Sequence, residues 1–186
     1  GHAKIQQKNP EKNIFECRGA WQITIEGLGF EGGRHQVYMQ NGNMDTGQVA
    51  DILGYLRKHW QGPIGMHAHD NMGNALSNSM VALDNGATWI DGTVCGMGRG
   101  AGNVRTEYLL VEMRRRGYGD FHAEAVFPLV LNNFEAMRQA YQWGPNLFYF
   151  LSGAYGIHPT YVQEMLKTSQ NETSQAITAL NRLHQD

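Results

Sequence analysis

The sequence predicts an α/β fold built on a parallel sheet, followed by a helical extension. Over residues 35–116, apolar strand-like segments alternate with amphipathic helical segments, and each strand-and-helix pair takes roughly 25–30 residues. Such alternation is typical of parallel sheets, whose strands are joined by helices. Residues 120–166 differ, since they are rich in aromatic side chains and have mainly helical patterns. We therefore predict a sheet domain over residues 1–119 and a helical extension over residues 120–186.

The first elements are extended segments. Residues 14–25 alternate apolar and polar side chains, and residues 35–41 form a second short apolar run, so both are predicted to contain strands. Asp45 then begins an Asp-Thr-Gly sequence that can cap the N-terminus of a helix. The apolar residues that follow recur at helical spacing and predict a helix: Val49, Ile52, Leu53, Leu56 and Trp60.

Two more strand-and-helix units follow. Residues 62–69 form an apolar run short enough to be a buried strand, and residues 72–86 have helical spacing and end in an Asn-Gly C-cap. Residues 88–96 predict the next strand, and a glycine-rich loop then leads into a helix expected over residues 104–116. A short amphipathic helix near the C-terminus is predicted from Ile177, Leu180 and Leu183.

The composition bounds the class of protein. The 186 residues are 41% hydrophobic and 17% charged, which is typical of a globular protein. The formal net charge of −2 gives no reason to expect nucleic acid or an acidic membrane as a partner. Two cysteines cannot form a disulfide framework, and no apolar run of about 18 residues predicts a membrane span. We find no secretion signal and expect a cytoplasmic protein.

The stretch GMHAHDNMGNALSN (residues 65–78) places two histidines and an aspartate where a predicted strand ends. On a strand, His67 and His69 point to the same face, about 6–7 Å apart. Two such imidazoles can chelate one divalent cation, and Asp70 can orient one of these ligands without binding the cation itself. The alternative is a pair of hydrogen-bonding histidines at a strand end. Because the functional groups of parallel sheets gather at the C-terminal ends of the strands, we expect His67, His69 and Asp70 on that rim.

The loop GMGRGAGN (residues 96–103) leads from a predicted strand into a helix. It can hold a phosphate or carboxylate at the helix N-terminus, with Arg99 as a candidate contact for the anion, or it can be a plain tight turn. Asn103 can serve as the N-cap of that helix or face a metal. Cys95 precedes the loop and is expected to be buried and inert.

The stretch HAHDNMGNALSNSMVALDNGATWIDGTVCGMGRGAGN (residues 67–103) resembles the signature of the DRE-TIM metallolyase superfamily, also called HMGL-like or pyruvate carboxyltransferase-like. The shared pattern is His-x-His-Asp, a small-residue helix, an aspartate in the next strand and a glycine loop that ends in Gly-Asn. WGPNLFYFLSGAYGIHPTYVQEML (residues 143–166) is similar to the C-terminal part of aldolase-like members. The resemblance is to members of the 4-hydroxy-2-oxovalerate aldolase type.

This resemblance implies a (β/α)8 TIM barrel with a divalent metal at its C-terminal rim. His67 and His69 match the two histidine ligands, Asp70 matches the residue beside them, and Asn103 matches a position on or near the metal. The implied cofactor is Mn²⁺, Mg²⁺, Zn²⁺ or Co²⁺, which polarises the oxygens of a 2-oxo acid and stabilises an enolate. We expect His67, His69 and Asn103 as metal residues, and Asp70 and Arg99 as candidate catalytic residues.

The chain departs from the family pattern in three respects. The family's first strand carries an Arg-Asp pair, and no such pair occurs in this sequence. The strand before the histidines ends with Asn41 in the position that is usually acidic. A complete barrel needs about 250 residues, and this sequence has 186. The chain is therefore interpreted as the C-terminal half of an aldolase, as a half-barrel completed by oligomerisation, or as a relative that keeps the fold without the chemistry.

The expected fold is thus a partial (β/α)8 barrel over residues 1–119 with a helical extension over residues 120–186. The expected function is a metal-dependent carbon–carbon lyase that cleaves or condenses a 2-oxo acid by aldol chemistry. Two alternatives are a Claisen-type acyltransferase that uses an acyl-CoA and a non-catalytic oligomerisation module. A homo-oligomer is expected because a half-barrel exposes apolar sheet and helix faces.

Overall fold

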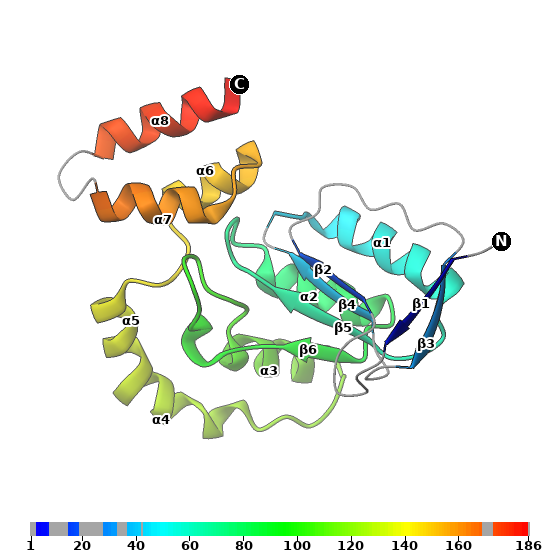
Figure 1. The fold of residues 1–186 in the computed structure, drawn as a ribbon. Coiled ribbons are helices and arrows are strands. Elements are labelled where there is room, and N and C mark those ends of the chain that lie inside the picture. Colours follow the sequence, from blue (N-terminus) through cyan, green and yellow to red (C-terminus); the bar gives the residue numbers. More distant parts are fainter. Residues whose placement is uncertain are drawn as a thin grey trace.

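The computed structural model describes residues 3–7, 15–18, 28–32, 37–41, 43–168 and 173–185 (Figure 1). Its main sheet has four parallel strands in the order β2 (Phe15–Arg18), β4 (Val37–Asn41), β5 (Ile64–Ala68) and β6 (Trp89–Asp91). Two further strands, β1 (Ala3–Gln7) and β3 (Leu28–Gly32), pair with each other in parallel. The predicted α/β fold with a parallel sheet is confirmed.

The described strands β4, β5 and β6 are each followed by a helix. The helices are α1 (Thr46–His59), α2 (Ala75–Asp84) and α3 (Thr106–Arg115), and α3 follows a short 3₁₀ turn, η1 (Val94–Gly96). Helix α2 contacts both α1 and α3, so consecutive helices are also neighbours in space. The predicted alternation over residues 35–116 therefore corresponds to successive strand–helix units.

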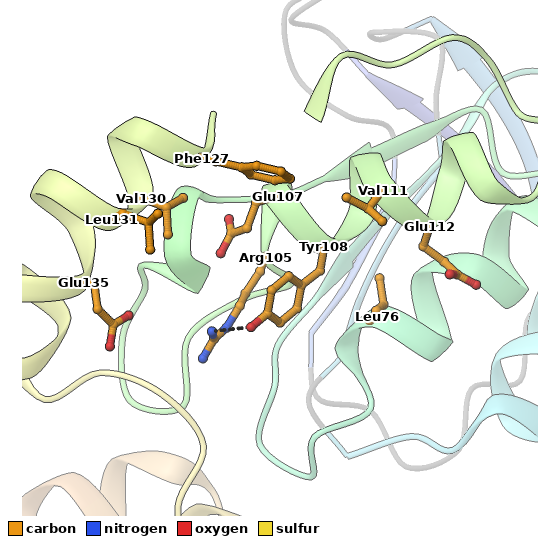
Figure 2. A pocket seen from close by; sticks show the side chains of 10 residues that line it. All are labelled: Leu76, Arg105, Glu107, Tyr108, Val111, Glu112, Phe127, Val130, Leu131 and Glu135. Carbon is orange, nitrogen blue, oxygen red and sulfur yellow. Dashed lines mark hydrogen bonds between the residues drawn. The ribbon is translucent and has the colours of Figure 1, made fainter. Parts of the chain in front are cut away.

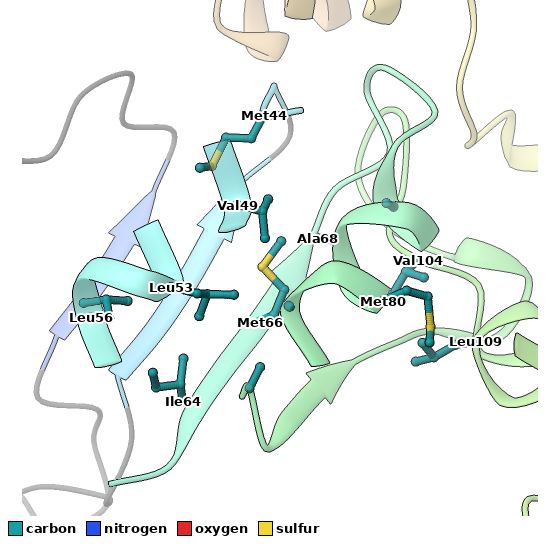
Figure 3. Close-up of a cluster of buried hydrophobic side chains, with 13 residues drawn as sticks. Met44, Val49, Leu53, Leu56, Ile64, Met66, Ala68, Met80, Val104 and Leu109 are labelled. Carbon is teal, nitrogen blue, oxygen red and sulfur yellow. The ribbon is translucent and has the colours of Figure 1, made fainter. Parts of the chain in front are cut away.

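The core lies between one face of the sheet and these helices (Figure 3). Alternate residues of β5, namely Ile64, Met66 and Ala68, are fully buried on this face. They pack with Val49 and Leu53 of α1, which are also fully buried. Helices α2 and α3 add buried residues to the same cluster: Ala75, Met80, Ala82 and Leu109. All three helices therefore cover the same face of the sheet.

The N-terminus of α1 is capped as its sequence predicts. The Asp45 Oδ1 atom accepts a hydrogen bond from the backbone N–H of Gln48 at 2.8 Å, and the Gln48 side chain accepts one from the backbone N–H of Asp45 at 3.1 Å. This reciprocal capping box pairs two N–H groups that the helix cannot pair internally.

Several element boundaries differ from the predicted ones. Helix α2 begins at Ala75 rather than at residue 72, and α3 begins at Thr106 rather than at residue 104. The Val104 N–H instead donates to the Ala68 carbonyl at 3.1 Å, which ties this residue to the end of β5. Strand β6 ends at Asp91 because the chain turns into η1, where Cys95 has a φ of 55°. Of the extended segment predicted over residues 14–25, β2 is described, and residues 19–25 lie outside the described residues.

The C-terminal region is helical, as predicted. Residues 123–141 contain a 3₁₀ turn, a short helix, a π-helical turn and a second helix: η2 (Ala123–Ala125), α4 (Phe127–Leu129), η3 (Val130–Phe134) and α5 (Glu135–Tyr141). Three helices then pack together as a separate group (Figure 1): α6 (Leu147–Tyr155), α7 (Pro159–Thr168) and α8 (Thr173–Gln185). In the described part of the chain, no helix is long and apolar enough to cross a membrane.

Helices α6, α7 and α8 enclose a second buried cluster, which includes Tyr149, Val162 and Leu180. Ala101 of the glycine-rich loop belongs to it as well. The contacts of this cluster with Ala101 connect residues on both sides of residue 120. The domain boundary expected there stays a prediction.

We expect Leu53→Ala to lower the free energy of unfolding by about 2–5 kcal/mol, because it leaves a cavity where a fully buried leucine packs against β5. Chemical denaturation of both proteins measures this difference. Leu131→Ala is the matched control, since Leu131 is 72% exposed, and it should change stability by less than about 0.5 kcal/mol. Equal losses in the two variants would contradict the assigned core.

Candidate functional site

The two histidines of the candidate site lie together at the end of β5. The centroids of the His67 and His69 rings are 4.8 Å apart, and the ring planes are nearly perpendicular, at 83°. His67 lies on the face of the sheet opposite to Met66 and Ala68, because successive strand residues alternate faces. The structure thus brings the two imidazoles into contact, as their spacing in the sequence predicts.

Asn103 comes from the other end of the glycine-rich loop and pairs with His69 through an isolated antiparallel β-bridge. Its side-chain Nδ2 donates to the Met97 carbonyl at 3.2 Å. Its Oδ1 is buried, and the Asn103 side chain interacts with the His69 imidazole. A buried amide oxygen beside an imidazole is a potential ligand for a hard or borderline cation.

Burial lowers the pKa of His69, because a partly desolvated site disfavours the charged imidazolium. The Gly102 carbonyl and the Asn103 side chain act in the opposite direction, and the positive charge of Arg99 lowers the pKa further. The net lowering favours the neutral imidazole at neutral pH, which is the form that binds metal ions. Arg99 is exposed in the loop. Its charge acts on His69, so the structure brings these two predicted site residues near each other.

Asp91 is a member of this group to which the sequence analysis assigned no role. Residues His67 and Asp91 are register partners on the adjacent strands β5 and β6, and the His67 Nδ1 lies 3.3 Å from the Asp91 Oδ2. Burial raises the pKa of the Asp91 carboxyl. An Nδ1–H donated to this carboxylate fixes the ring and directs its lone pair to Nε2. The signal was available in the aspartate of the motif, but only the strand register identifies its partner.

Asp70 has a structural role that its position in the motif did not reveal. Its Oδ1 accepts a hydrogen bond from the backbone N–H of Ala75 at 3.0 Å, at the first residue of α2. Asn74, the N-cap residue of α2, makes no such side-chain bond, so Asp70 supplies the cap. The backbone N–H of Asp70 also donates to the Gly102 carbonyl at 3.0 Å. Burial raises the pKa of its carboxyl, against the opposing effects of the Ala75 N–H and of Arg105.

The donor set described here is small. Two imidazoles and one amide oxygen meet at the rim, and the described residues contain no group of three or more His, Cys, Asp or Glu side chains that could hold a metal ion. The residues that are present fit a divalent cation in donor type, but they do not complete its coordination. A further acidic ligand would have to come from other residues.

A separate cavity of about 590 Å³ lies between α3 and the segment formed by α4 and η3 (Figure 2). Its walls are mostly apolar and include Tyr108 and Val111 of α3 and Phe127 and Leu131 opposite them. No predicted site residue lines it. The buried Glu107 carboxylate beside it accepts a hydrogen bond from the Cys95 N–H at 3.0 Å, so this glutamate supports the start of the glycine-rich loop.

The sequence over residues 39–130 matches the profile of the HMGL-like family. This matched segment contains both histidines, Asp91 and the complete glycine-rich loop. Residues 39–130 belong to the HMGL-like family. The family predicted from the His-x-His-Asp and Gly-Asn motifs is therefore confirmed for this part of the chain.

Curated and solved proteins that bear aldolase names are similar to this chain. The 4-hydroxy-2-oxovalerate aldolase of Pelotomaculum thermopropionicum is 42% identical over 88 residues, which cover 46% of this chain and 26% of that protein. The N-terminal domain of a candidate aldolase from Bacteroides vulgatus has 35% identity and a TM-score of 0.65, and the match covers 76% of this chain and 48% of that one.

A more distant match is the carboxyl transferase domain of Rhizobium etli pyruvate carboxylase. It has 19% identity and a TM-score of 0.58, with 76% of this chain and 25% of that chain covered. This likeness concerns the fold alone. The chain spans about a quarter of the curated aldolase and about half of the Bacteroides domain, so much of each relative lies outside the matched part.

We expect Asp70→Ala to destabilise the protein by about 1 kcal/mol, because the first turn of α2 loses its cap. Asp70→Asn keeps an oxygen acceptor and should cost clearly less. Chemical denaturation compares the two variants with Asp51→Ala, a change at an exposed position within α1. Equal losses for the alanine and asparagine variants would argue against the capping role.

Proposed function

We propose that this chain is part of a divalent-metal-dependent carbon–carbon lyase that cleaves or condenses a 2-oxo acid by aldol chemistry. The observation that carries the proposal is the contact of the His67 and His69 rings at the end of a parallel strand, beside the buried oxygen of Asn103. This group lies inside the segment that belongs to the HMGL-like family. The relatives that bear the name 4-hydroxy-2-oxovalerate aldolase support the reaction class.

In this proposal His67 and His69 hold the cation through ring nitrogens, and the Asn103 oxygen is a third candidate ligand. Mn²⁺, Mg²⁺, Zn²⁺ and Co²⁺ are the candidate ions, and their common chemistry is to polarise the carbonyl oxygen of the 2-oxo acid. Asp91 orients the His67 ring through the contact at Nδ1. Arg99, exposed in the loop and near His69, is the residue that we propose to pair with the carboxylate of the substrate.

We further propose that the chain forms part of a (β/α)8 barrel. Strands β4, β5 and β6 are neighbours in chain order, and their helices cover one face, which is the arrangement of consecutive barrel units. The opposite face would be the barrel interior. It carries Trp89, which is 61% exposed, and Asp91, whose side chain is 53% exposed. In a closed barrel this face is packed, so further strands from a longer chain or a second copy are expected to cover it.

One observation favours a different function, that of a barrel module without catalysis. The described residues contain no group of three or more His, Cys, Asp or Glu side chains that could hold a metal ion, and the sequence contains no Arg-Asp pair. Such a module would keep the parallel sheet and the paired histidines as structural features. Metal binding by the purified protein distinguishes it from a lyase.

The first test is metal binding with and without the paired imidazoles. We expect the protein to bind Mn²⁺ or Zn²⁺ in about a one-to-one ratio, and His67→Ala/His69→Ala to abolish this binding. Titration and elemental analysis measure it. The matched control is His59→Ala/His122→Ala, which removes two exposed imidazoles outside the site. Absence of binding, or binding that is equal in both double variants, would support the non-catalytic module, and the lyase proposal would fail.

A second test concerns Asp91. We expect Asp91→Asn to weaken Mn²⁺ binding about 10- to 100-fold, because the His67 ring loses the carboxylate that orients it. Asp84→Asn is the control, since Asp84 is an exposed aspartate at the end of α2. Isothermal titration of both variants measures the affinities. Unchanged affinity in Asp91→Asn would show that the histidine is held in another way.

A further inference from the structure

The glycine-rich loop, residues 96–103, has a backbone that needs external support. Gly100 and Gly102 have φ values of 64° and 77°, and both lie in the left-handed region that favours glycine. A segment with this conformational freedom loses much entropy when it is held in one shape. The contacts that fix the loop therefore influence how Asn103 lies beside His69.

At its C-terminal end the loop is held by the residues that follow strand β5, through the Asp70 N–H bond to the Gly102 carbonyl and the bridge between His69 and Asn103. Contacts at its start and middle come from the chain that follows residue 142. The Trp143 Nε1–H donates to the Cys95 carbonyl at 3.0 Å in a buried hydrogen bond, just before the loop begins. The Gly144 N–H donates to the Gly100 carbonyl at 3.0 Å, in the middle of the loop. The two bonds thus join the residue before the loop and the middle of the loop to the segment that leads into α6.

Side chains from α6 and α7 pack on the same part of the loop. A Cβ atom built on Gly100 would lie 3.1 Å from the Tyr149 ring and 3.0 Å from the Gln163 amide nitrogen, so these groups already rest against the backbone. Ala101 is 2% exposed and belongs to the buried cluster of α6, α7 and α8. Tyr149 and Gln163 thus contact the loop at Gly100.

Within the loop, short-range hydrogen bonds connect the supported residues to Asn103. The Asn103 N–H donates to the Gly96 carbonyl at 3.1 Å, and the Gly102 N–H donates to the Arg99 carbonyl at 3.1 Å. A Cβ atom on Gly102 would lie 2.1 Å from the Gly96 carbonyl oxygen, which shows how closely the two ends of the loop approach. A shift at Gly100 therefore has little room to be absorbed before it reaches Asn103.

The same helices also reach the rim by a second route. Gly153 of α6 lies against the Met72 side chain, since a Cβ atom there would be 2.6 Å from the Met72 Cγ and 3.7 Å from the Asn43 Oδ1. Asn43 follows β4 and Met72 follows β5, so α6 contacts the ends of two neighbouring strands. Helix α6 therefore lies against the C-terminal ends of the strands, where the histidines also lie.

We propose that Trp143, Tyr149 and Gln163 are positioning residues that clamp the glycine-rich loop and thereby hold Asn103 beside His69. This inference goes beyond the proposed lyase function, and its effect on metal binding rests on that function. The clamp itself can be tested in the metal-free protein. The residues that form it lie outside the segment matched by the HMGL-like profile, which ends at residue 130.

The main test compares Gly100→Ala with Gly117→Ala. Both glycines have positive φ, 64° and 79°, but an added methyl meets Tyr149 and Gln163 at position 100 and no atom within 4 Å at position 117. We expect Gly100→Ala to accelerate amide hydrogen exchange over residues 96–103 about 10-fold and to shift the ring NMR signals of His69. Gly117→Ala should leave both unchanged. The Mn²⁺ affinity should fall about 10-fold in Gly100→Ala alone.

Variants of Trp143 and Tyr149 separate the positioning of the loop from general destabilisation of the protein. Trp143→Phe removes the bond to the Cys95 carbonyl but keeps an aromatic ring, and Tyr149→Ala removes the ring that rests on Gly100. We expect both to reproduce the loop exchange and the His69 shift of Gly100→Ala. Tyr149→Phe keeps the ring on Gly100 but loses the hydrogen bond between the Tyr149 hydroxyl and the Gln163 side chain, so it should have a smaller effect than Tyr149→Ala.

The outcomes distinguish the two proposals. Unchanged exchange and unchanged His69 signals in Gly100→Ala would overturn the clamp, as would equal effects of Gly117→Ala. Faster exchange with unchanged His69 signals would show that the loop moves without moving the site, and this result also overturns the inference. If the parent protein binds no Mn²⁺, the lyase proposal fails, while the exchange and NMR data still decide the clamp.

Discussion

The parallel pairing of β4, β5 and β6 is the constraint on which the rest of the structure depends. Its register aligns Gln40, His67 and Asp91 across three strands, so the histidine and the carboxylate that contacts it share one level of the sheet. Parallel pairing also requires a crossover after each strand, and α1 and α2 provide these crossovers. A shift of one residue in this register would place His67 opposite a side chain of the other face and would separate it from Asp91.

The two faces of this sheet have opposite character. Ile64, Met66 and Ala68 bury one face against the helices, and this contact supplies the apolar burial that holds the sheet together. His67, Trp89 and Asp91 lie on the other face, where a polar site can exist only if the core does not need that surface. The separation explains how one five-residue strand supports both the core and the candidate site.

Local patterns in the sequence were sufficient for some of these features. Helical spacing predicted α1 and α2, Asp45 predicted the cap of α1, and the His-x-His spacing predicted the paired rings. The contact between His67 and Asp91 needs the register of two strands, which no local pattern contains. Asp70 illustrates the same limit, because its cap on Ala75 depends on the turn that delays the start of α2. The early end of β6 at Asp91 follows from the η1 turn, whose left-handed Cys95 no propensity favours.

The candidate site is therefore assembled from parts with different origins. Strand register fixes His67 and Asp91, while Asn103 depends on a glycine-rich loop that Trp143, in the segment before α6, and Tyr149 of α6 hold in place. With two imidazoles and one amide as the described donors, small displacements of one donor matter more than in a site with several acidic ligands. In the proposed metal site, a cation with so few ligands gains most from rigid support of each one. This requirement gives a physical reason for the C-terminal helices to lie against the strand ends and the loop rather than elsewhere on the sheet.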